Sequence, residues 1–522
     1  MTDTAETPTQ SDLEARGANR SRAPKDAAGF MSAIVTGWAP RPDAAPEPSP
    51  AAEHTARRRA AVSAAFPGER LVIPAGELRV RSNDCDYRFR AHSAFIHLTG
   101  LEAEEEPDAV LVLDPVADPE AAGSTTSDEA PAIAPTHEAT LYFAPDPGRS
   151  SEEFFSNSRY GEFWVGRRPT LAEMAARTGL RTAHIDELGD ALAKDAGPGH
   201  VAVRVVRQAS QAVDAQVAQV RQQSGLSQGE EADQVDAKLA EFLSELRLVK
   251  DAYEIAEMRK AVAATIEGFA EVVRQLPRAT AHPRGERVVE TAFFTRARED
   301  GNGLGYDTIA AAGPHGATLH YITNDGPVTE GDLLLLDAGV EVDSLYTADI
   351  TRTLPISGRF TDAQRRVYLA VLDAADAAFA AAATPGAYFR DVHDAAIAVI
   401  AARVAQWGLV DQSVEELLGP DGQQHRRWMV HGTSHHLGLD VHDCAQARRE
   451  MYLDRKLEPG MCFTIEPGLY FHADDLTVPE ELRGMSVRIE DDVLVTNDGV
   501  ENLSAALPRH PDEIEAWMAS LR

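Results

Sequence analysis

The sequence of 522 residues contains only three cysteines, Cys85, Cys444 and Cys462. They are too few and too widely spaced for a disulfide framework, and no pair has the C-x-x-C spacing of a metal ribbon. Without a defined acid-base partner, none of them indicates a thiol enzyme. The scarcity of cysteine predicts a reducing, cytoplasmic setting.

Basic residues are scarce relative to acidic ones, with 50 Lys and Arg against 83 Asp and Glu and a formal net charge of −33. Duplex nucleic acid and anionic membranes both favour basic patches, so we expect neither as a partner. No uninterrupted apolar run is long enough to span a bilayer, and the N-terminus lacks the basic-then-apolar order of a signal peptide. We therefore expect neither export nor membrane insertion.

Several catalytic motifs are missing as well. The sequence has no H-E-x-x-H zinc motif and no G-x-S-x-G nucleophile elbow. The glycine-containing stretch "GNGLGY" lacks the spacing of a nucleotide-binding loop and a preceding strand. A zinc protease of that type, a serine hydrolase and a dinucleotide enzyme are therefore not indicated.

The N-terminal half shows two changes of composition. Residues 1–55 are rich in Ala, Pro, Asp and Glu, which predicts a disordered acidic tail with a short helix possible near residues 29–38. Residues 56–247 contain four apolar runs ended by Gly, Pro or a charge, "RLVIPAG", "AFIHLTG", "AVLVLD" and "ATLYFAP". We interpret these runs as strands that alternate with helices in an α/β domain. An extended surface loop is expected at residues 114–137.

A helical connector and a second domain follow. Residues 201–250 carry apolar positions at helical spacing around a polar break, which predicts two helices joined by an exposed turn. A long amphipathic helix from about residue 250 then opens the domain of residues 248–522.

Four carboxylates stand on or beside apolar strands of this domain. "DLLLLDAGV" ends its apolar run at Asp337, and "TADITRT" places Asp349 in a Thr-rich stretch that is predicted to be a return strand. "FTIEPGLY" contains Glu466, and "SVRIEDDVLV" places Glu490 in a strand with Arg488 on the same face. Each acid alone is most simply a solvated or capping residue. Four that converge would repel one another unless cations were bound, and two divalent ions would cancel their charges.

Histidine is concentrated in one stretch, "MVHGTSHHLGLDVHD", with four histidines in fifteen residues. Two glycines break any helical face, so the stretch is a loop whose function needs partners elsewhere in the chain.

In this order and these settings the sequence resembles the dinuclear pita-bread metallopeptidases, a family that includes methionine aminopeptidase, prolidase and aminopeptidase P. The resemblance implies that Asp349 and Glu490 bridge two ions, that Asp337 completes one ion's ligands, and that His435 and Glu466 complete those of the other. Oxygen-rich ligation with one imidazole favours Mn²⁺ or Co²⁺ over structural zinc, and Mn²⁺ is typical of the family. Two ions roughly 3.5–4 Å apart can hold a bridging hydroxide that attacks an amide carbonyl.

The resemblance also assigns histidines to the reaction. His431 and His442 match positions that contact substrate or stabilise the intermediate, and His320 matches a further one. Glu466 is the expected proton acceptor. His436 has no role in the family pattern, so we interpret it as structural.

Tyr306 and Arg488 are expected to support the ligands from behind. Asp337 and Asp349 are twelve residues apart where the family often has eleven. We expect the extra residue in the turn or in a bulge, because otherwise strand alternation would turn Asp349 to the wrong face.

The N-terminal half resembles the first domain of aminopeptidase P, prolidase and creatinase in "RSNDCDYRFRAHSAFIHLTG" and "EFFSNSRYGEFWVGRRPT", and Asp84 matches an acidic residue near the active site. The expected fold class is α/β (α+β), with a pita-bread catalytic domain preceded by a creatinase-like α/β domain. The resemblance implies Xaa-Pro aminopeptidase activity in a homodimer or homotetramer. A prolidase acting on Xaa-Pro dipeptides is the alternative. A non-catalytic pita-bread binding protein is disfavoured because the ligand set is intact.

Overall fold

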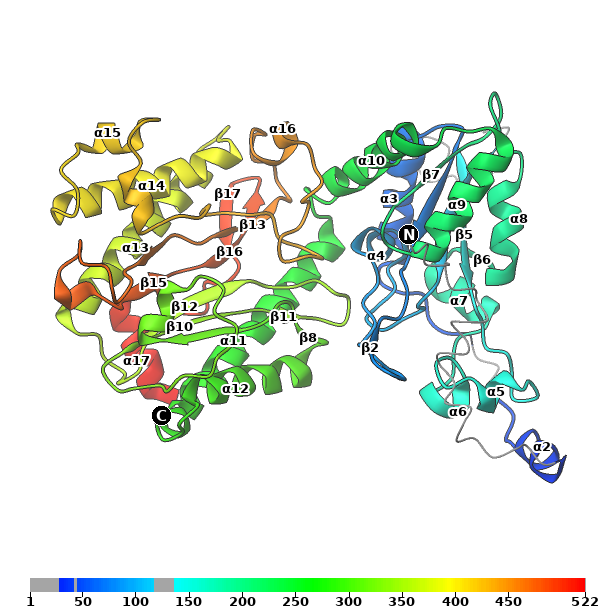
Figure 1. The fold of residues 1–522 in the computed structure, drawn as a ribbon, viewed down its shortest axis with the longest axis horizontal. Coiled ribbons are helices and arrows are strands. Elements are labelled where there is room, and N and C mark those ends of the chain that lie inside the picture. The colour runs from blue at the N-terminus through cyan, green and yellow to red at the C-terminus, as the bar shows by residue number, and fades with distance from the viewer. Residues whose placement is uncertain (1–27, 42–44, 117–135, 522) are drawn as a thin grey trace, which may run out of the picture. The chain divides into compact units, whose positions relative to one another are not determined.

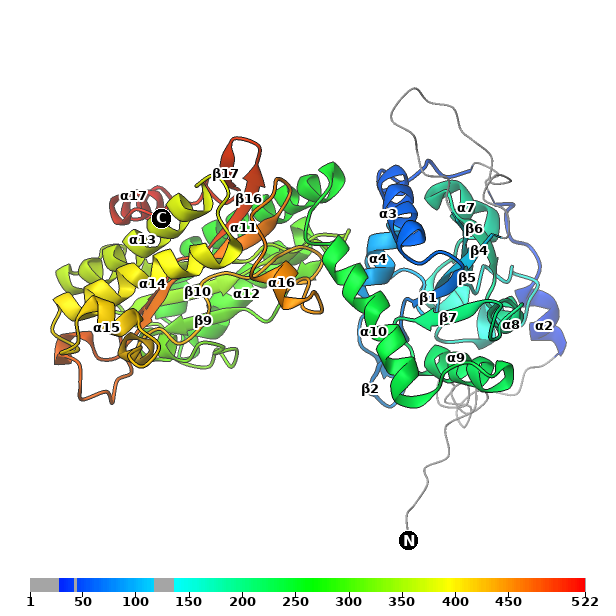
Figure 2. The ribbon, with the colours of Figure 1, turned by 90° about the horizontal axis from the view of Figure 1, so that it is seen from above.

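The computed structural model describes residues 28–41, 45–116 and 136–521. Two compact units, residues 1–240 and 241–522, account for the fold (Figures 1 and 2). Their boundary lies inside helix α10 (Gly229–Leu246), a few residues before the predicted one. Residues 1–27 of the predicted tail and most of the expected loop at residues 114–137 lie outside the described residues.

The first unit is built on a five-stranded mixed sheet of order β6-β5-β4-β1-β7. The neighbours β1–β4 and β4–β5 are antiparallel, whereas β1–β7 and β5–β6 are parallel. A separate hairpin joins β2 and β3. The strands of this unit are β1 (Glu69–Pro74), β2 (Val80–Ser82), β3 (Cys85–Asp86), β4 (Val110–Pro115), β5 (His137–Phe143), β6 (Arg181–His184) and β7 (Ala202–Val205).

Helices of the first unit cover its sheet, and a core of valine and leucine side chains joins β1, β4 and β7 to α8 and α9. The helical segments are α2 (Ala28–Ile34), α3 (Ala52–Ala65), α4 (Ser93–Thr99), α5 (Glu153–Ser156), α6 (Glu162–Val165), α7 (Leu171–Thr178), η2 (Ile185–Glu187), α8 (Leu188–Ala193) and α9 (Gln211–Ser224). With α10, helix α9 forms the predicted pair of connector helices.

Two predictions for this unit are wrong. The run "AFIHLTG" is helix α4, capped by the His92 side chain and ended by Gly100 in the left-handed conformation. Every residue of α4 is buried, so its sequence shows no amphipathic period that would distinguish it from a buried strand. The predicted tail is also too long, because Ala51 is fully buried and α3 begins at Ala52.

The second unit contains ten short strands in four small sheets, of orders β12-β10-β9, β11-β8, β13-β16-β17 and β14-β15. The pairings within these sheets are antiparallel. The strands are β8 (Gly303–Leu304), β9 (Ile309–Ala312), β10 (Leu333–Ala338), β11 (Val340–Glu341), β12 (Ile350–Pro355), β13 (Cys462–Ile465), β14 (Gly468–Tyr470), β15 (Ser486–Arg488), β16 (Asp491–Thr496) and β17 (Gly499–Asn502).

Two helix pairs, α11–α12 and α13–α14, flank these strands in the view of Figure 1. The α11–α12 pair packs closely at Gly268, because glycine has no side chain and leaves room for the Phe293 ring. A Cβ at this position would lie 2.5 Å from the ring. The helical segments of this unit are α11 (Ala252–Thr280), α12 (Gly285–Asp300), η3 (Gly313–Ala317), α13 (Asp362–Ala382), α14 (Phe389–Gln406), α15 (Val414–Leu418), η4 (Gln424–Arg427), α16 (Arg449–Tyr452), η5 (Glu480–Leu482) and α17 (Pro511–Leu521).

The connection between the first two candidate ligands contains a turn, and the placement of the extra residue there stays a prediction. Asp337 pairs with Thr351 across β10 and β12, which leaves Asp349 just before β12. Between them the chain turns at residues 342–346, where Leu345 adopts a left-handed φ of 68°. Gly339 is required here, because a Cβ on it would lie 1.8 Å from the Ala348 carbonyl oxygen.

The apolar run around Glu490 is two strands and not one. Arg488 ends β15 opposite Gly468 of β14, whereas Asp491 begins β16 opposite Ile465 of β13. Pro467, between β13 and β14, has no N–H to continue a ladder, so the strand changes partner at this point. Glu490 therefore lies in the junction, where its N–H donates to the Thr351 carbonyl oxygen at 3.0 Å.

A buried arginine locks this junction. Arg352 of β12 pairs with Asp491, and both side chains have no solvent exposure. The guanidinium also donates to the carbonyl oxygens of Glu490 at 2.6 Å and of Leu507 and Pro508 at 3.0 Å. The Arg352 side chain thus joins β12 to the start of β16 and to the segment before α17.

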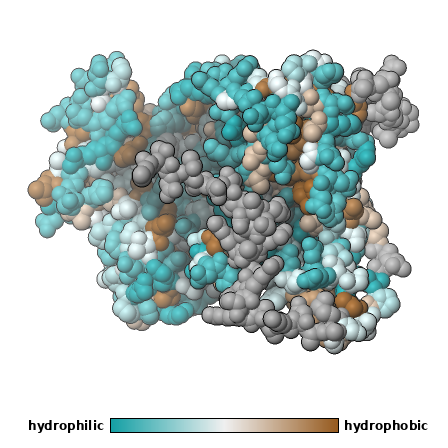
Figure 3. Space-filling model, turned by 45° about the vertical axis from the view of Figure 1, so that its right-hand side comes forward, coloured by the Kyte–Doolittle hydropathy of each residue, from teal (hydrophilic) through white to brown (hydrophobic). Residues whose placement is uncertain are grey.

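The surface is mostly polar, in keeping with the charged composition. Figure 3 shows one face on which hydrophilic residues predominate and hydrophobic ones form small, separate patches. Within the residues that the structure describes, no helix combines the length and apolar character needed to cross a bilayer.

Replacing Arg352 should strongly destabilise the protein. Arg352→Met removes the 2.6 Å partner of the buried Asp491 carboxylate and leaves it Arg509, whose Nε lies 3.5 Å from Oδ2, so we expect a loss of about 3 kcal/mol in the free energy of unfolding. Urea denaturation followed by tryptophan fluorescence measures the loss. Arg366→Met is the matched control, because Arg366 pairs with Glu481 at an exposed site and should cost less than about 1 kcal/mol. Equal losses for the two variants would contradict the role given to Arg352.

Candidate metal centre

The two predicted aspartate ligands converge on one tyrosine. The Tyr306 hydroxyl lies 2.6 Å from Asp337 Oδ1 and 2.5 Å from Asp349 Oδ1, although it can donate only one proton at a time. Arg488 pairs with the other oxygen of Asp337. Tyr306 and Arg488 therefore both contact the Asp337 carboxylate, and their role as supports of a metal ligand stays a prediction.

His435 faces three of the carboxylates. Its Nε2 atom lies 3.3 Å from Asp349 Oδ2, 3.8 Å from Glu466 Oε1 and 3.9 Å from Glu490 Oε1. Ligand atoms of Asp349, His435 and Glu490 all lie within 4.8 Å of one another, which is close enough for a shared ion. All five predicted ligands thus meet in one network, with Asp337 joined to it through Tyr306.

The carboxyl groups of the network are unfavourable as anions in the metal-free protein. Burial raises the pKa of Glu490 and Asp337, and the neighbouring carboxylate of Asp349 raises both further. Burial also raises the pKa of Glu466 to about 7, against the opposing effect of His435. For His435 burial lowers the pKa, but Asp349 and Glu466 reverse that effect and raise it to about 9.

His431 lies beside the predicted ligand Glu466. His431 Nδ1 lies 3.6 Å from Glu466 Oε2, while its Nε2 lies 2.7 Å from the Tyr470 hydroxyl. Burial, aided by the Arg488 charge, lowers the pKa of His431 to about 4, so its imidazole is neutral. Arg488 donates to the Tyr470 hydroxyl at 3.2 Å and thereby connects His431 to the supporting pair of Asp337.

Of the other two predicted histidines, His442 contacts His435 and His320 acts electrostatically on His431. The His442 ring stands nearly perpendicular to that of His435, with the centroids 4.5 Å apart. His320 is exposed on the loop after β9, near enough to lower the pKa of both His431 and His442 electrostatically.

Three residues that sequence reasoning missed complete the network. They are Tyr470, which contacts His431; Thr351, whose hydroxyl donates to Glu490 Oε2 at 2.7 Å; and Asp492, whose carboxylate accepts from the Asp349 N–H at 3.2 Å. Strand alternation offered a signal for two of them, because Thr351 and Asp492 follow predicted ligands by two residues.

Two further predicted residues lie outside this network. His436 is fully buried, stacks on Phe389 with 4.4 Å between centroids and packs against Tyr452, which supports its structural interpretation. Asp84 is exposed in the turn between β2 and β3 of the first unit, and its role stays a prediction.

The residues present fit a pair of divalent cations. Asp337, Asp349, Glu466, Glu490 and Asp492 provide up to five negative charges, and the Arg488 guanidinium pairs with the Asp337 carboxylate. Carboxylate oxygens with a single imidazole form a donor set typical of Mn²⁺ and similar ions. Two bound cations would offset the repulsion that raises the pKa of Asp337, Glu466 and Glu490.

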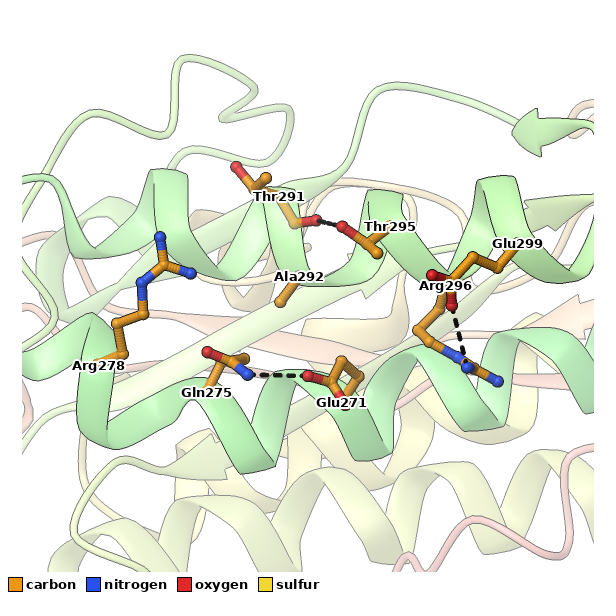
Figure 4. A pocket seen from close by; sticks show the side chains of 8 residues that line it. All are labelled: Glu271, Gln275, Arg278, Thr291, Ala292, Thr295, Arg296 and Glu299. Atoms are coloured by element: carbon orange, nitrogen blue, oxygen red, sulfur yellow. Dashed lines mark hydrogen bonds and ion pairs between the residues drawn. The ribbon is translucent and has the colours of Figure 1, made fainter.

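A groove of this unit, apart from the predicted site residues, is lined mainly by polar and charged side chains. The groove between α11 and α12, with a volume of about 340 Å³, is lined by Glu271, Gln275, Arg278, Thr291, Ala292, Thr295, Arg296 and Glu299 (Figure 4). Its polar groups bond to each other, with Gln275 2.9 Å from Glu271 and Arg296 3.2 Å from Glu299. None of the predicted site residues lines this groove.

Known families match both units of the chain. Residues 256–497 match metallopeptidase family M24, and residues 54–202 match the aminopeptidase P N-terminal domain. The first match includes all five predicted ligands.

Individual relatives extend over nearly the whole chain. The chain is 50% identical to Xaa-Pro aminopeptidase 1 of Streptomyces coelicolor, over 94% of this chain and 91% of the relative. It is 31% identical to the Xaa-Pro aminopeptidase of Escherichia coli, over 90% of this chain and 98% of that one. Among solved structures, an Escherichia coli aminopeptidase P variant in complex with substrate is 29% identical, with a TM-score of 0.74 and coverage of 91% and 100%.

Cation binding should stabilise the protein more at higher pH. Glu466 holds its proton up to about pH 7 in the folded metal-free protein but only to about 4.5 when unfolded, so its contribution to stability falls as pH rises through this window. The contribution of His435 is fully present below its ordinary value of 6.5 and is lost as pH rises to about 9. A cation replaces these protons, so its apparent affinity should rise about tenfold per pH unit for each proton displaced.

Differential scanning fluorimetry with MnCl₂ against a chelator, at pH 5.5 to 8, measures this effect. We expect the rise in Tm on adding Mn²⁺ to grow with pH, and to disappear in Glu490→Gln while persisting in the surface control Glu481→Gln. A rise that is the same at every pH would contradict the proton displacement.

Proposed function

Because the chain belongs to the M24 metallopeptidases and carries the aminopeptidase P N-terminal domain, we propose that it is a metal-dependent Xaa-Pro aminopeptidase. It would remove the first residue from peptides whose second residue is proline. Relatives named for this activity align along nine-tenths of the chain or more.

One observation carries the proposal. Three carboxylates lie 3.3 to 3.9 Å from His435 Nε2, and the fourth, that of Asp337, shares the Tyr306 hydroxyl with Asp349. Without cations this arrangement is electrostatically unfavourable, since burial and neighbouring carboxylates raise the pKa of Asp337, Glu466 and Glu490. A site of this kind is explained by cation binding and has no evident value to the fold itself.

Asp349 and Glu490 would bridge two divalent ions, Asp337 would complete the ligands of one, and His435 with Glu466 those of the other. We propose Mn²⁺ as the ion, because the donor set suits it. When bound, such ions supply Lewis acidity and a water of lowered pKa for attack on an amide carbonyl.

The residues of the chain would manage the protons and the developing charge. Glu466, whose side chain is partly exposed beside His435, would accept a proton from the attacking water as the tetrahedral centre forms. His442 and His320 donate hydrogen bonds to the carbonyl oxygen of the scissile bond, and His431 contacts the substrate. Tyr306 and Arg488 hold the carboxylate of Asp337 in place.

The substrate class follows from the same comparison. An Xaa-Pro bond is a tertiary amide without an N–H, so an enzyme cannot bind it through a donor at that nitrogen. Prolidase activity on Xaa-Pro dipeptides is the second candidate, because it uses the same ligand set. We further propose a homodimer or homotetramer in the cytoplasm, with Asp84 near the edge of the substrate pocket.

A substrate comparison tests the activity. Purified protein with MnCl₂ is incubated with Ala-Pro and with Ala-Pro-Ala, and released alanine is measured with and without a chelator. We expect release from the tripeptide to be faster, and to stop in chelator. A strong preference for the dipeptide would instead assign prolidase activity, and no metal-dependent release from either would overturn the proposal.

Glu466 should affect catalysis and metal binding together. For Glu466→Ala we expect kcat to fall about 10²- to 10⁴-fold, the effect of removing a positioned acid-base group. Metal content, measured by plasma mass spectrometry after desalting, should fall below that of the wild type. Glu480→Ala, at an exposed glutamate of the same unit, is the control. Unchanged turnover with full metal content in Glu466→Ala would exclude this assignment.

A further inference from the structure

Three charged side chains are buried together beneath the histidine loop. Arg247 Nε donates to Asp443 Oδ1 at 2.9 Å, and Lys250 Nζ lies 3.8 Å from Asp443 Oδ2. The exposed fractions of the Arg247, Lys250 and Asp443 side chains are 9%, 0% and 1%. Burying charges is costly, and none of these residues takes part in the reaction proposed above. The cluster therefore needs another explanation.

Asp443 connects the buried cluster to the backbone of the histidine loop. Its N–H donates to the His436 carbonyl oxygen at 2.9 Å, and its Oδ1 accepts from the Cys444 N–H at 2.7 Å. The backbone of the loop also packs against the Asp443 carboxylate at Gly438. A Cβ at Gly438 would lie only 2.4 Å from Asp443 Oδ2. These contacts fix the backbone on both sides of Asp443.

The direction of His442 depends on this arrangement. Asp443 points into the buried cluster, while the preceding His442 is exposed and its ring meets that of His435 at 4.5 Å. The next residue, Cys444, adopts a left-handed φ of 61°, which a non-glycine residue keeps only where its surroundings hold it. Releasing Asp443 would free the peptide units that orient His442.

The two cations also keep Asp443 ionised. Burial alone would raise the pKa of this carboxyl group, but Arg247 and Lys250 lower it below its ordinary value. Lys250 Nζ donates to the Arg247 carbonyl oxygen at 2.7 Å, so the two cations are themselves held in a fixed relation just after α10.

We propose that Asp443 is a positioning residue, held by Arg247 and Lys250, which directs His442 toward the carbonyl oxygen of the substrate. The inference rests on the proposed function for the role of His442. Asp443 touches neither substrate nor metal ligands and acts through its neighbour.

A double-mutant cycle distinguishes this role from a general effect on stability. Asp443→Asn is made in the wild type and in His442→Ala, and kcat and KM for Ala-Pro-Ala are measured well below each variant's Tm, normalised to metal content. In the wild type we expect kcat to fall about 10- to 100-fold, as for a misplaced catalytic group, with a smaller change in KM. In the His442→Ala background the same substitution should change kcat less than about twofold.

An equal loss of kcat in both backgrounds would overturn the proposal, as would an unchanged kcat in Asp443→Asn. Asp474→Asn is the control, because Asp474 is an exposed aspartate of the same unit. If Asp443→Asn does not fold, Arg247→Lys replaces it in the cycle, since this substitution keeps the charge and removes the guanidinium geometry.

A measurement that does not require catalysis tests the positioning role of Asp443 separately from the proposed aminopeptidase activity. In metal-free protein labelled with ¹³C at histidine Cε1, Asp443→Asn should shift or broaden the His442 resonance, assigned from its loss in His442→Ala. The exposed His200 and His472 should keep their resonances. This result would stand even if the wild type released no amino acid, and an unchanged His442 resonance would overturn the positioning role.

Discussion

Mutual repulsion among buried carboxylates is the constraint on which the catalytic unit depends. Asp337, Asp349, Glu466 and Glu490 approach one another closely, and Asp492 lies directly behind them. In water these groups would separate, so the surrounding strands must hold them against an unfavourable electrostatic free energy. Bound cations would attract the carboxylates, so the electrostatic free energy of the site would be unfavourable without cations and favourable with them.

The frame around the site resists this repulsion through contacts that tolerate little change. Gly339 lets two backbone segments approach beside Asp337, and Arg352 ties together the strands that carry Asp349 and Glu490. Tyr306 and Arg488 hold the ligands with hydrogen bonds that a neutral hydrocarbon could not replace. Rigidity at the site is therefore a consequence of packing and buried pairing some distance from the reacting atoms.

A second buried charge cluster lies on the other side of the histidine loop. Arg247 and Asp443 are 196 residues apart in sequence, and their pairing fixes the loop that carries His435 and His442. The loop thus contacts two polar networks, the carboxylates that we propose as cation ligands and the cluster in which Arg247 and Lys250 neutralise Asp443. This arrangement fixes the backbone beside His442 and leaves the His442 side chain exposed.

The four acids could be singled out in the sequence because each stands on or beside an apolar run, a local pattern that a single sequence displays. Their assignment as metal ligands came from the family resemblance and stays a prediction. The long helix α11 was predictable from a local pattern as well, since its apolar face repeats along the chain. Helix α4 was not, because burial on all sides removes the period that marks a helix. The break at Glu490, the hydroxyl of Tyr470 and the pairing of Arg247 with Asp443 were decided only by tertiary structure. Each depends on which distant segments pack together, and no local pattern of residues encodes that choice.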